Sequence, residues 1–440
     1  MRRPPTTIAA CVVWVGFACE DSTPTLTPME AGADAAVATD DLTDVPGVRD
    51  AMADARTDGP PDDAAARDTL LIRLFRVPDN TPAGVPIHLA GAFNAWNPGA
   101  ADARFQRDGR TLAVRVRGLA AGQRVEFKLT RGSWATVERD DAGRDLPNRA
   151  VTFDPARPTV AVYVERWADL GAPSTTRSGD VRVLRDLPIP QLGRARNVWV
   201  YLPPGHDEGA ARYPVMYLYD GQNVFDARAS AFGREWRVDE ALEAMHHEGR
   251  HPGVIAVAVE NGPERPCEYN VFAADPHPGC ADRNALGDRT NAFLVETLKP
   301  RVDREYRTLP GRDDTAVVGS SMGGAMAVRL GFSRPDLFSR VAALSPSYQN
   351  VLGAPVGMPD FVRAQRPTMP FRLHQDIGSV ERIRELGPDV LARNMTAVHD
   401  AARAAGLADE RNRAAMVPGA IHEEAAWAAR IDEIVAWLWR

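Results

Sequence analysis

The hydrophobic positions of the chain follow two successive patterns. From Thr69 to about Glu165, short apolar and β-branched runs are separated by turn-forming residues, and no helical period is sustained. Short strands at this spacing are typical of an antiparallel β-sandwich of about a hundred residues. The expected strands cover residues 70–75, 85–90, 112–116, 124–129 and 160–164.

Beyond about Asp180, nearly continuous apolar strands alternate with helical segments. The expected strands cover residues 197–202, 215–219, 254–259, 315–318, 341–344 and 372–376. The expected helices cover residues 238–245, 292–301, 324–330, 389–405 and 427–439. Apolar strands that alternate with helices form mostly parallel sheets covered on both faces, so this region is predicted to be an α/β domain.

The first residues are typical of an export signal. Arg2 and Arg3 precede a short apolar stretch, residues 8–18, that ends at Cys19, and this stretch is too short to span a bilayer. Residues 16–19 resemble a bacterial lipobox, in which the cysteine is lipidated and becomes the mature N-terminus. We therefore expect an exported protein, a cell-envelope lipoprotein held to the membrane only through a lipid on Cys19. The alternatives are a secreted protein with a cleaved signal and an apolar N-terminus that is not cleaved.

Charge is concentrated in the segment that follows. The chain carries a net charge of -7, and residues 20–68 contain 13 acidic residues against three arginines and no aromatic residue. Such a segment cannot bury enough apolar surface to fold, which predicts a disordered acidic linker. The remaining chain is close to neutral, which gives no reason to expect nucleic-acid binding. The expected layout is a signal in 1–19, a linker in 20–68, a β-sandwich in 69–166 and the α/β domain in 167–440.

The strongest chemical motif is Gly319-Ser320-Ser321-Met322-Gly323. It follows an apolar strand and precedes a helical segment, as in the nucleophile elbow of α/β-hydrolases, where flanking glycines let strand and helix approach closely. The Gly-x-Ser-x-Gly pattern by itself is weak evidence, because it also occurs by chance in chains of this length. Its position between a strand and a helix predicts an α/β-hydrolase fold with Ser321 as nucleophile.

A serine nucleophile needs a base and an acid, and in this fold they follow it in the order acid, histidine. Of the later histidines, His374 falls in an expected strand and His399 in an expected helix, whereas His422 lies in a loop before the last helix. His422 is the expected base. Glu381, in the loop after the strand that ends near Asp376, is the expected acid, with Asp376 itself as the alternative.

The oxyanion hole is expected to use two backbone N–H groups. One belongs to Met322, which follows the nucleophile, and the other to Gln222 in the loop after the third strand, where Gly221 permits close approach.

From Asn197 to Trp439 the chain resembles the esterase family that includes enterochelin esterase and esterase D. The resemblance rests on residues 213–223, 319–324, 343–347 and 418–423. It implies hydrolysis of a small-molecule or glycan ester through a serine acyl-enzyme, on substrates such as siderophores or feruloylated glycans. The alternatives are acyl transfer to a sugar acceptor and a noncatalytic surface protein that binds glycans.

The β-rich region resembles the early-set immunoglobulin-like modules related to the glycogen-binding domain of AMP-activated protein kinase. The resemblance rests on residues 89–98, which contain the Gly-x-Phe-Asn-x-Trp signature, and on residues 125–129. It implies a sugar platform formed by Trp96, Trp134 and Lys128. The sequence before Trp134 departs from the family pattern, so the alternative is that both tryptophans serve packing.

Cys267 and Cys280 bracket a loop and, in an exported protein, are expected to form a disulfide. His246, His247, Glu248 and His251 lie at a helix end and are interpreted as a solvated face. No metal and no cofactor are expected, because a serine triad needs neither.

Overall fold

The computed structural model describes residues 68–272, 285–348, 357–366, 369–383 and 385–440. Cys19, Cys280 and the expected signal and linker fall outside these residues. The described residues belong to one compact unit, Asp62–Arg440. None of the described helices is long and apolar enough to cross a membrane.

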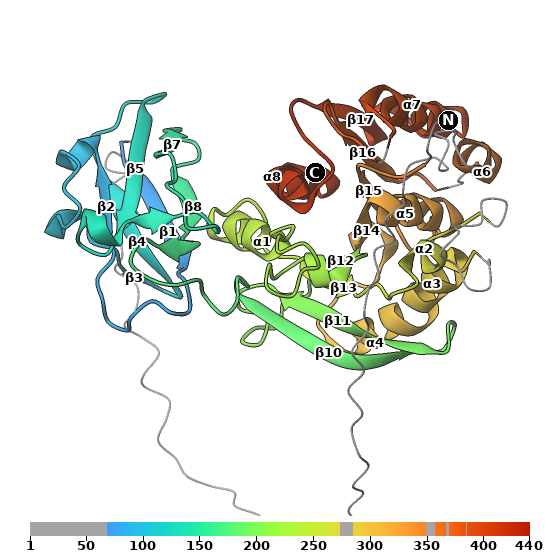
Figure 1. Ribbon diagram of the computed structural model, residues 1–440, viewed down its shortest axis with the longest axis horizontal. Coiled ribbons are helices and arrows are strands. Elements are labelled where there is room, and N and C mark those ends of the chain that lie inside the picture. Colours follow the sequence, from blue (N-terminus) through green and yellow to red (C-terminus); the bar gives the residue numbers. More distant parts are fainter. Residues whose placement is uncertain (1–67, 273–284, 349–356, 367–368, 384) are drawn as a thin grey trace, which may run out of the picture. The chain divides into compact units, whose positions relative to one another are not determined.

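The N-terminal region is built from small β-sheets (Figure 1). One sheet has the order β3-β4-β1-β8, a second has the order β2-β5-β7, and β6 pairs with β9. Their buried side chains form a common core that includes Phe127 and Trp167. The strands are β1 (Leu70–Arg76), β2 (His88–Gly91), β3 (Gln106–Asp108), β4 (Thr111–Val116), β5 (Arg124–Thr130), β6 (Glu138–Arg139), β7 (Arg149–Thr152), β8 (Thr159–Tyr163) and β9 (Arg166–Trp167).

All five expected strands of this region are present, but the sheets are not wholly antiparallel. β1 and β8 pair in parallel, with Ile72 opposite Val160. A parallel pair needs a long connection between its strands, and here the rest of the module supplies it.

The C-terminal region has the α/β-hydrolase fold, centred on an eight-stranded sheet of order β10-β11-β13-β12-β14-β15-β16-β17. The first two pairings are antiparallel and the others are parallel. The strands are β10 (Asp180–Ile189), β11 (Arg194–Leu202), β12 (Val215–Leu218), β13 (Ile255–Val259), β14 (Thr315–Ser320), β15 (Arg340–Leu344), β16 (Arg372–Gly378) and β17 (Asn412–Val417).

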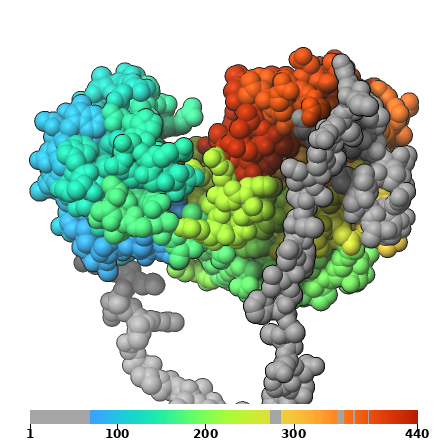
Figure 2. All heavy atoms as spheres, viewed as in Figure 1, coloured from blue at the N-terminus to red at the C-terminus, as the bar shows by residue number. Residues whose placement is uncertain are grey.

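Helices cover both faces of this sheet. They are α1 (Val238–His247), α2 (Arg265–Glu268), α3 (Gly287–Phe293), α4 (Lys299–Glu305), α5 (Ser321–Ser333), α6 (Met358–Gln365), α7 (Pro388–Ala404) and α8 (Glu424–Leu438). Side chains along β12 alternate between two cores, since Val215 and Tyr217 pack with α5 and α7, while Met216 and Leu218 pack with α1 and α8. Figure 2 shows the yellow-green atoms of α1 against the red C-terminal atoms, in agreement with the edge contact of Trp236 and Trp427.

Candidate active site

Ser321 occupies a strained turn between β14 and α5. Its φ of 53° is left-handed, a conformation that costs a non-glycine residue free energy and is common at active sites. An added Cβ at Gly319 would overlap the carbonyl oxygen of Gly323, and one at Gly323 would lie 3.0 Å from the Cβ of Tyr219. The two glycines therefore permit the close approach that this turn requires.

The Ser321 hydroxyl lies beside the segment that follows β15. Its Oγ is 3.2 Å from the Oγ of Ser347, and the Ser347 N–H donates to the Ser321 carbonyl at 2.9 Å. Among the described residues, no hydrogen bond joins Ser321 to His422. Ser347 lies in the segment 343–347 that carries the family resemblance, but the sequence alone did not suggest a contact with Ser321.

His422 and Glu381 come together from two neighbouring loops. His422 Nδ1 lies 3.3 Å from Glu381 Oε2, and the Glu381 side chain is fully buried. Backbone hydrogen bonds hold the loops after β16 and β17 together, from Ser379 to Val417 at 2.9 Å and from Val380 to Ala420 at 3.3 Å. The carboxylate beside the imidazole is thus that of Glu381.

Asp376, the alternative acid, is engaged elsewhere. Its carboxylate accepts two hydrogen bonds from Arg430 and lies 2.9 Å from His374 Nε2. Burial favours the neutral carboxyl, but the hydrogen bond from His374 and the charge of Arg430 outweigh it and hold the pKa of Asp376 below its ordinary value. Asp376 is therefore an ionised partner of Arg430.

The expected oxyanion donors lie at two helix starts. Met322 is the second residue of α5, and Gln222 is the second residue of the 3-10 turn Gly221–Asn223, so neither N–H has an acceptor within its own helix. An added Cβ at Gly221 would lie 2.5 Å from the Ala258 carbonyl oxygen. Glycine is therefore needed there for the loop to lie against β13.

Asp220, just before this turn, has a φ of 59° and is fixed by partners that the sequence did not reveal. Arg265 donates to both of its carboxylate oxygens at 2.6 and 2.7 Å, and Asn261 donates to one at 2.5 Å. The Tyr269 hydroxyl accepts the Asp220 N–H at 3.1 Å. These residues lie more than 40 positions from Asp220 in the chain, so no local motif connects them to it.

In the N-terminal region, Trp96 and Trp134 lie together, with ring centroids 6.5 Å apart and planes inclined by 37°. Trp134 is 45% exposed. The Lys128 ammonium donates to the Leu146 carbonyl, and burial lowers the pKa of Lys128. The two rings thus form a partly exposed aromatic pair, while the lysine is hydrogen-bonded to the backbone.

Cys267 is buried in α2 and disulfide-bonded. Cys280 lies outside the described residues, so the expected pairing stays a prediction.

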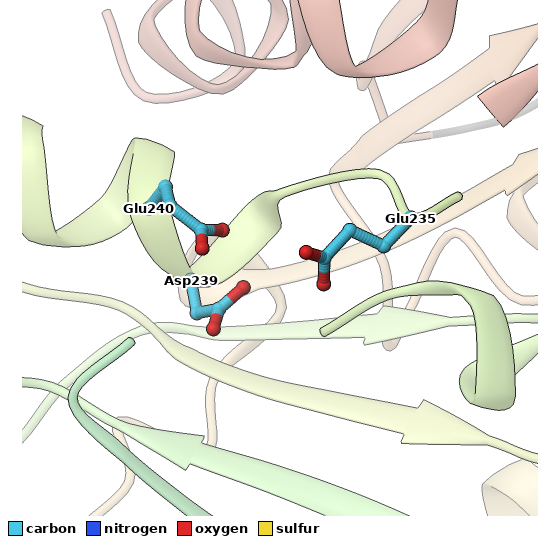
Figure 3. Close-up of side chains that lie close together, drawn as sticks. All are labelled: Glu235, Asp239 and Glu240. Carbon is cyan, nitrogen blue, oxygen red and sulfur yellow. The ribbon is translucent and has the colours of Figure 1, made fainter. Parts of the chain in front are cut away.

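One group of described side chains has the composition of a metal site. The carboxylates of Glu235, Asp239 and Glu240 converge at the start of α1, with one oxygen of each within 4.8 Å of the others (Figure 3). Burial raises the pKa of all three, and Arg76 lies 3.5 Å from Glu240. Ser178 donates to Asp239 from its N–H at 2.6 Å and to Glu240 from its hydroxyl at 3.0 Å. At the end of α1, His247 pairs with Glu243 and His246 with the Pro252 carbonyl.

Comparison with known proteins identifies the family. The family model described as "Putative esterase" matches residues 189–438, more than half of the chain. The N-terminal region is similar to part of an alpha-amylase of Niallia circulans, at 44% identity over 95 residues, which are 21% of this chain and only 7% of the amylase.

Two further similarities cover longer stretches. The uncharacterized protein YbbA of Bacillus subtilis is 22% identical over 255 residues, which are 56% of this chain and 92% of YbbA. The enterobactin esterase of Shigella flexneri, solved in the presence of enterobactin, is 16% identical with a TM-score of 0.46 and aligns with 84% of this chain and 92% of its own. On the family match, the chain belongs to the putative esterase family.

Proposed function

We propose that this protein is an exported serine esterase in which Ser321, His422 and Glu381 form the catalytic triad. Membership of the esterase family supports hydrolysis of carboxylic esters. The assignment of the three triad residues rests on the geometry around Ser321 and His422. Ser321 has the strained conformation of a nucleophile elbow, and the His422–Glu381 pair follows it in the chain order of α/β-hydrolases.

The reaction begins with the Ser321 hydroxyl turned from Ser347 toward His422. His422 takes the hydroxyl proton as Ser321 Oγ attacks the ester carbonyl, and Glu381 holds the imidazole and stabilises its charged form. The N–H groups of Met322 and Gln222 stabilise the oxyanion of the tetrahedral intermediate. His422 then gives the proton to the leaving alcohol, and a water molecule, activated by His422, releases the acid and restores Ser321.

Labelling with a fluorophosphonate probe tests this mechanism. We expect labelling at Ser321 in the intact protein, none in Ser321→Ala, and strongly reduced labelling in His422→Ala. His399→Ala, which changes a histidine on α7, is the matched control and should label normally. A labelled protein that hydrolyses no ester in a panel of aryl esters, feruloyl sugars and siderophores would contradict the esterase assignment.

A second activity, glycan binding, is favoured by the Trp96–Trp134 pair. Sugar rings stack their apolar faces on exposed aromatic rings, and the similarity to part of an amylase supports the same role. We infer that the N-terminal module binds a glycan and brings the esterase to a carbohydrate-linked ester. Product analysis with and without a glycan acceptor separates hydrolysis from acyl transfer, in which a sugar hydroxyl replaces water.

Export as a lipoprotein is the proposed localisation, supported by the residues before Cys19. Metabolic labelling with a fatty acid should mark the wild-type protein and not Cys19→Ala. Absence of label together with a shortened N-terminus would instead show ordinary cleaved secretion.

A further inference from the structure

Ser345 combines burial, backbone strain and a hydroxyl that faces the active site. It directly follows β15, is fully buried and has a φ of 47°. Its N–H donates to the Asp376 carbonyl oxygen at 2.9 Å, which fixes the backbone beside β16. A non-glycine residue keeps such a conformation only where its surroundings enforce it. The mechanism described above gives this residue no role.

The hydrogen bonds of Ser345 leave one direction for its proton. Trp427 Nε1 and the Arg430 guanidinium both donate to Ser345 Oγ, at 2.9 and 3.0 Å. A hydroxyl has two lone pairs and one hydrogen, so these two donors occupy the lone pairs. The hydrogen must then point to its third neighbour, Glu381 Oε1, with which Ser345 forms a short hydrogen bond.

The two oxygens of the Glu381 carboxylate have different partners. Its Oε1 accepts from the Ser345 hydroxyl and from the Gly378 N–H at 2.9 Å. Its Oε2 faces His422 Nδ1. The first oxygen thus anchors the carboxylate, and the second is presented to the imidazole.

Two residues of α8 link this anchor to the base. Trp427, which donates to Ser345, also packs edge-on against the His422 ring, with centroids 5.2 Å apart and planes at 87°. Arg430 donates two hydrogen bonds to Asp376, whose carboxylate balances the charge of the guanidinium. Trp427 therefore contacts both His422 and Ser345, the residue that holds Glu381.

We propose that Ser345 is a positioning residue for the triad, and that its hydroxyl, oriented by Trp427 and Arg430, sets the direction in which Glu381 meets His422. The inference rests on the proposed function. It predicts that loss of the hydroxyl misaligns His422 and slows attack by Ser321, while substrate binding is kept.

The test compares Ser345→Ala and Ser345→Gly in the full-length protein. Glycine relieves the positive φ and removes the hydroxyl, whereas alanine removes only the hydroxyl. We expect both variants to lose about 10- to 100-fold in kcat and in the rate of fluorophosphonate labelling, with KM nearly unchanged. Trp427→Phe keeps the ring beside His422 but lacks the N–H, and should show a smaller loss. Ser339→Ala, at the opposite end of β15, is the control for loss of a buried serine hydroxyl.

A spectroscopic measurement separates positioning from general destabilisation. The strongly deshielded proton of the His422–Glu381 hydrogen bond should be visible in the wild type, absent in Glu381→Gln, and shifted or lost in Ser345→Gly. A folded Ser345→Gly protein with wild-type kcat and an unchanged resonance would overturn the inference. Failure of the wild type to label at Ser321 would instead refute the proposed function, and the resonance would still report on the positioning of His422.

Discussion

Arg430 binds Asp376 with two hydrogen bonds, from Nε at 3.0 Å and from a terminal nitrogen at 2.7 Å, in a fully buried position. Bidentate geometry of this kind gives the strongest pairing between an arginine and a carboxylate. The two carboxylates of this loop region therefore have separate tasks, one toward Arg430 and one toward His422. Substitution of each should have a different consequence.

Asp376→Asn leaves the charge of Arg430 buried without its counter-ion. We expect it to lower the free energy of unfolding by about 3 kcal/mol, measured by urea denaturation, while folded protein keeps much of its kcat. Glu381→Gln should do the reverse, with kcat lowered about 10²- to 10⁴-fold and stability changed less. Equal losses of kcat in both variants would contradict this separation of tasks.

Gly319→Ala should disrupt the nucleophile turn. The added methyl group would overlap the Gly323 carbonyl, and overpacking of this type costs about 1 to 3 kcal/mol. We expect lower thermal stability together with loss of Ser321 labelling. Gly311→Ala is the matched control, since a Cβ there meets no atom within 4 Å, and it should leave both properties unchanged.

Glu235→Gln should stabilise the protein at neutral pH. Burial, and after it the charge of Glu240, raises the pKa of Glu235 well above its ordinary value of 4.5. The folded chain thus binds more protons than the unfolded chain, so wild-type stability falls as pH rises above about 4.5. Glutamine does not ionise, and the variant escapes this loss.

The measurement is urea unfolding of both proteins between pH 4 and pH 8. The difference in free energy should be small near pH 4 and reach on the order of 1 kcal/mol or more at neutral pH. Glu410→Gln, at an exposed position, should show no such dependence. A variant less stable than wild type at pH 8 would indicate that the ionised Glu235 carboxylate is needed, for example by a bound cation.

Trp134→Ala should abolish retention of the protein in gels that contain soluble starch, because it removes the more exposed ring of the pair. Hydrolysis of a small soluble ester should be unchanged. Phe232→Ala removes an aromatic side chain that is 70% exposed in the C-terminal region and should leave retention intact. Retention that survives in Trp134→Ala would support a packing role for the tryptophans.

The strands of the large sheet that were expected from the sequence are those with a nearly continuous apolar run, because helices cover both of their faces. All six expected strands of the sheet are present, whereas the strands β10 and β17 and the helices α2 and α6 of this region were missed. β10 is an edge strand with an irregularity between Leu184 and Leu187, and β17 is the opposite edge. Edge strands bury fewer of their side chains, so their sequences show a weaker hydrophobic pattern.

The residues of the candidate site also differ in how far the sequence could predict them. Ser321 could be proposed from the sequence because its turn requires small neighbours at fixed offsets, and His422 because few histidines follow Ser321. Glu381 was preferred over Asp376 only from its place in the loop after the strand, since the partners that distinguish the two carboxylates, Arg430 and Ser345, are distant in the chain. Tertiary contacts of this kind leave no spacing to read.

Trp427 and Arg430 lie on α8, the last helix of the chain, so they are synthesised after the rest of the site. Ser321, its turn and most of the sheet are made before Trp427 and Arg430, which follow more than a hundred residues later in the chain. A growing polypeptide therefore contains Ser321 and its turn well before the α8 residues that support Ser345 and Glu381 have been made. If α8 must dock for Glu381 and His422 to align, an incomplete chain cannot carry out the proposed reaction, and activity begins only once α8 has packed onto the sheet.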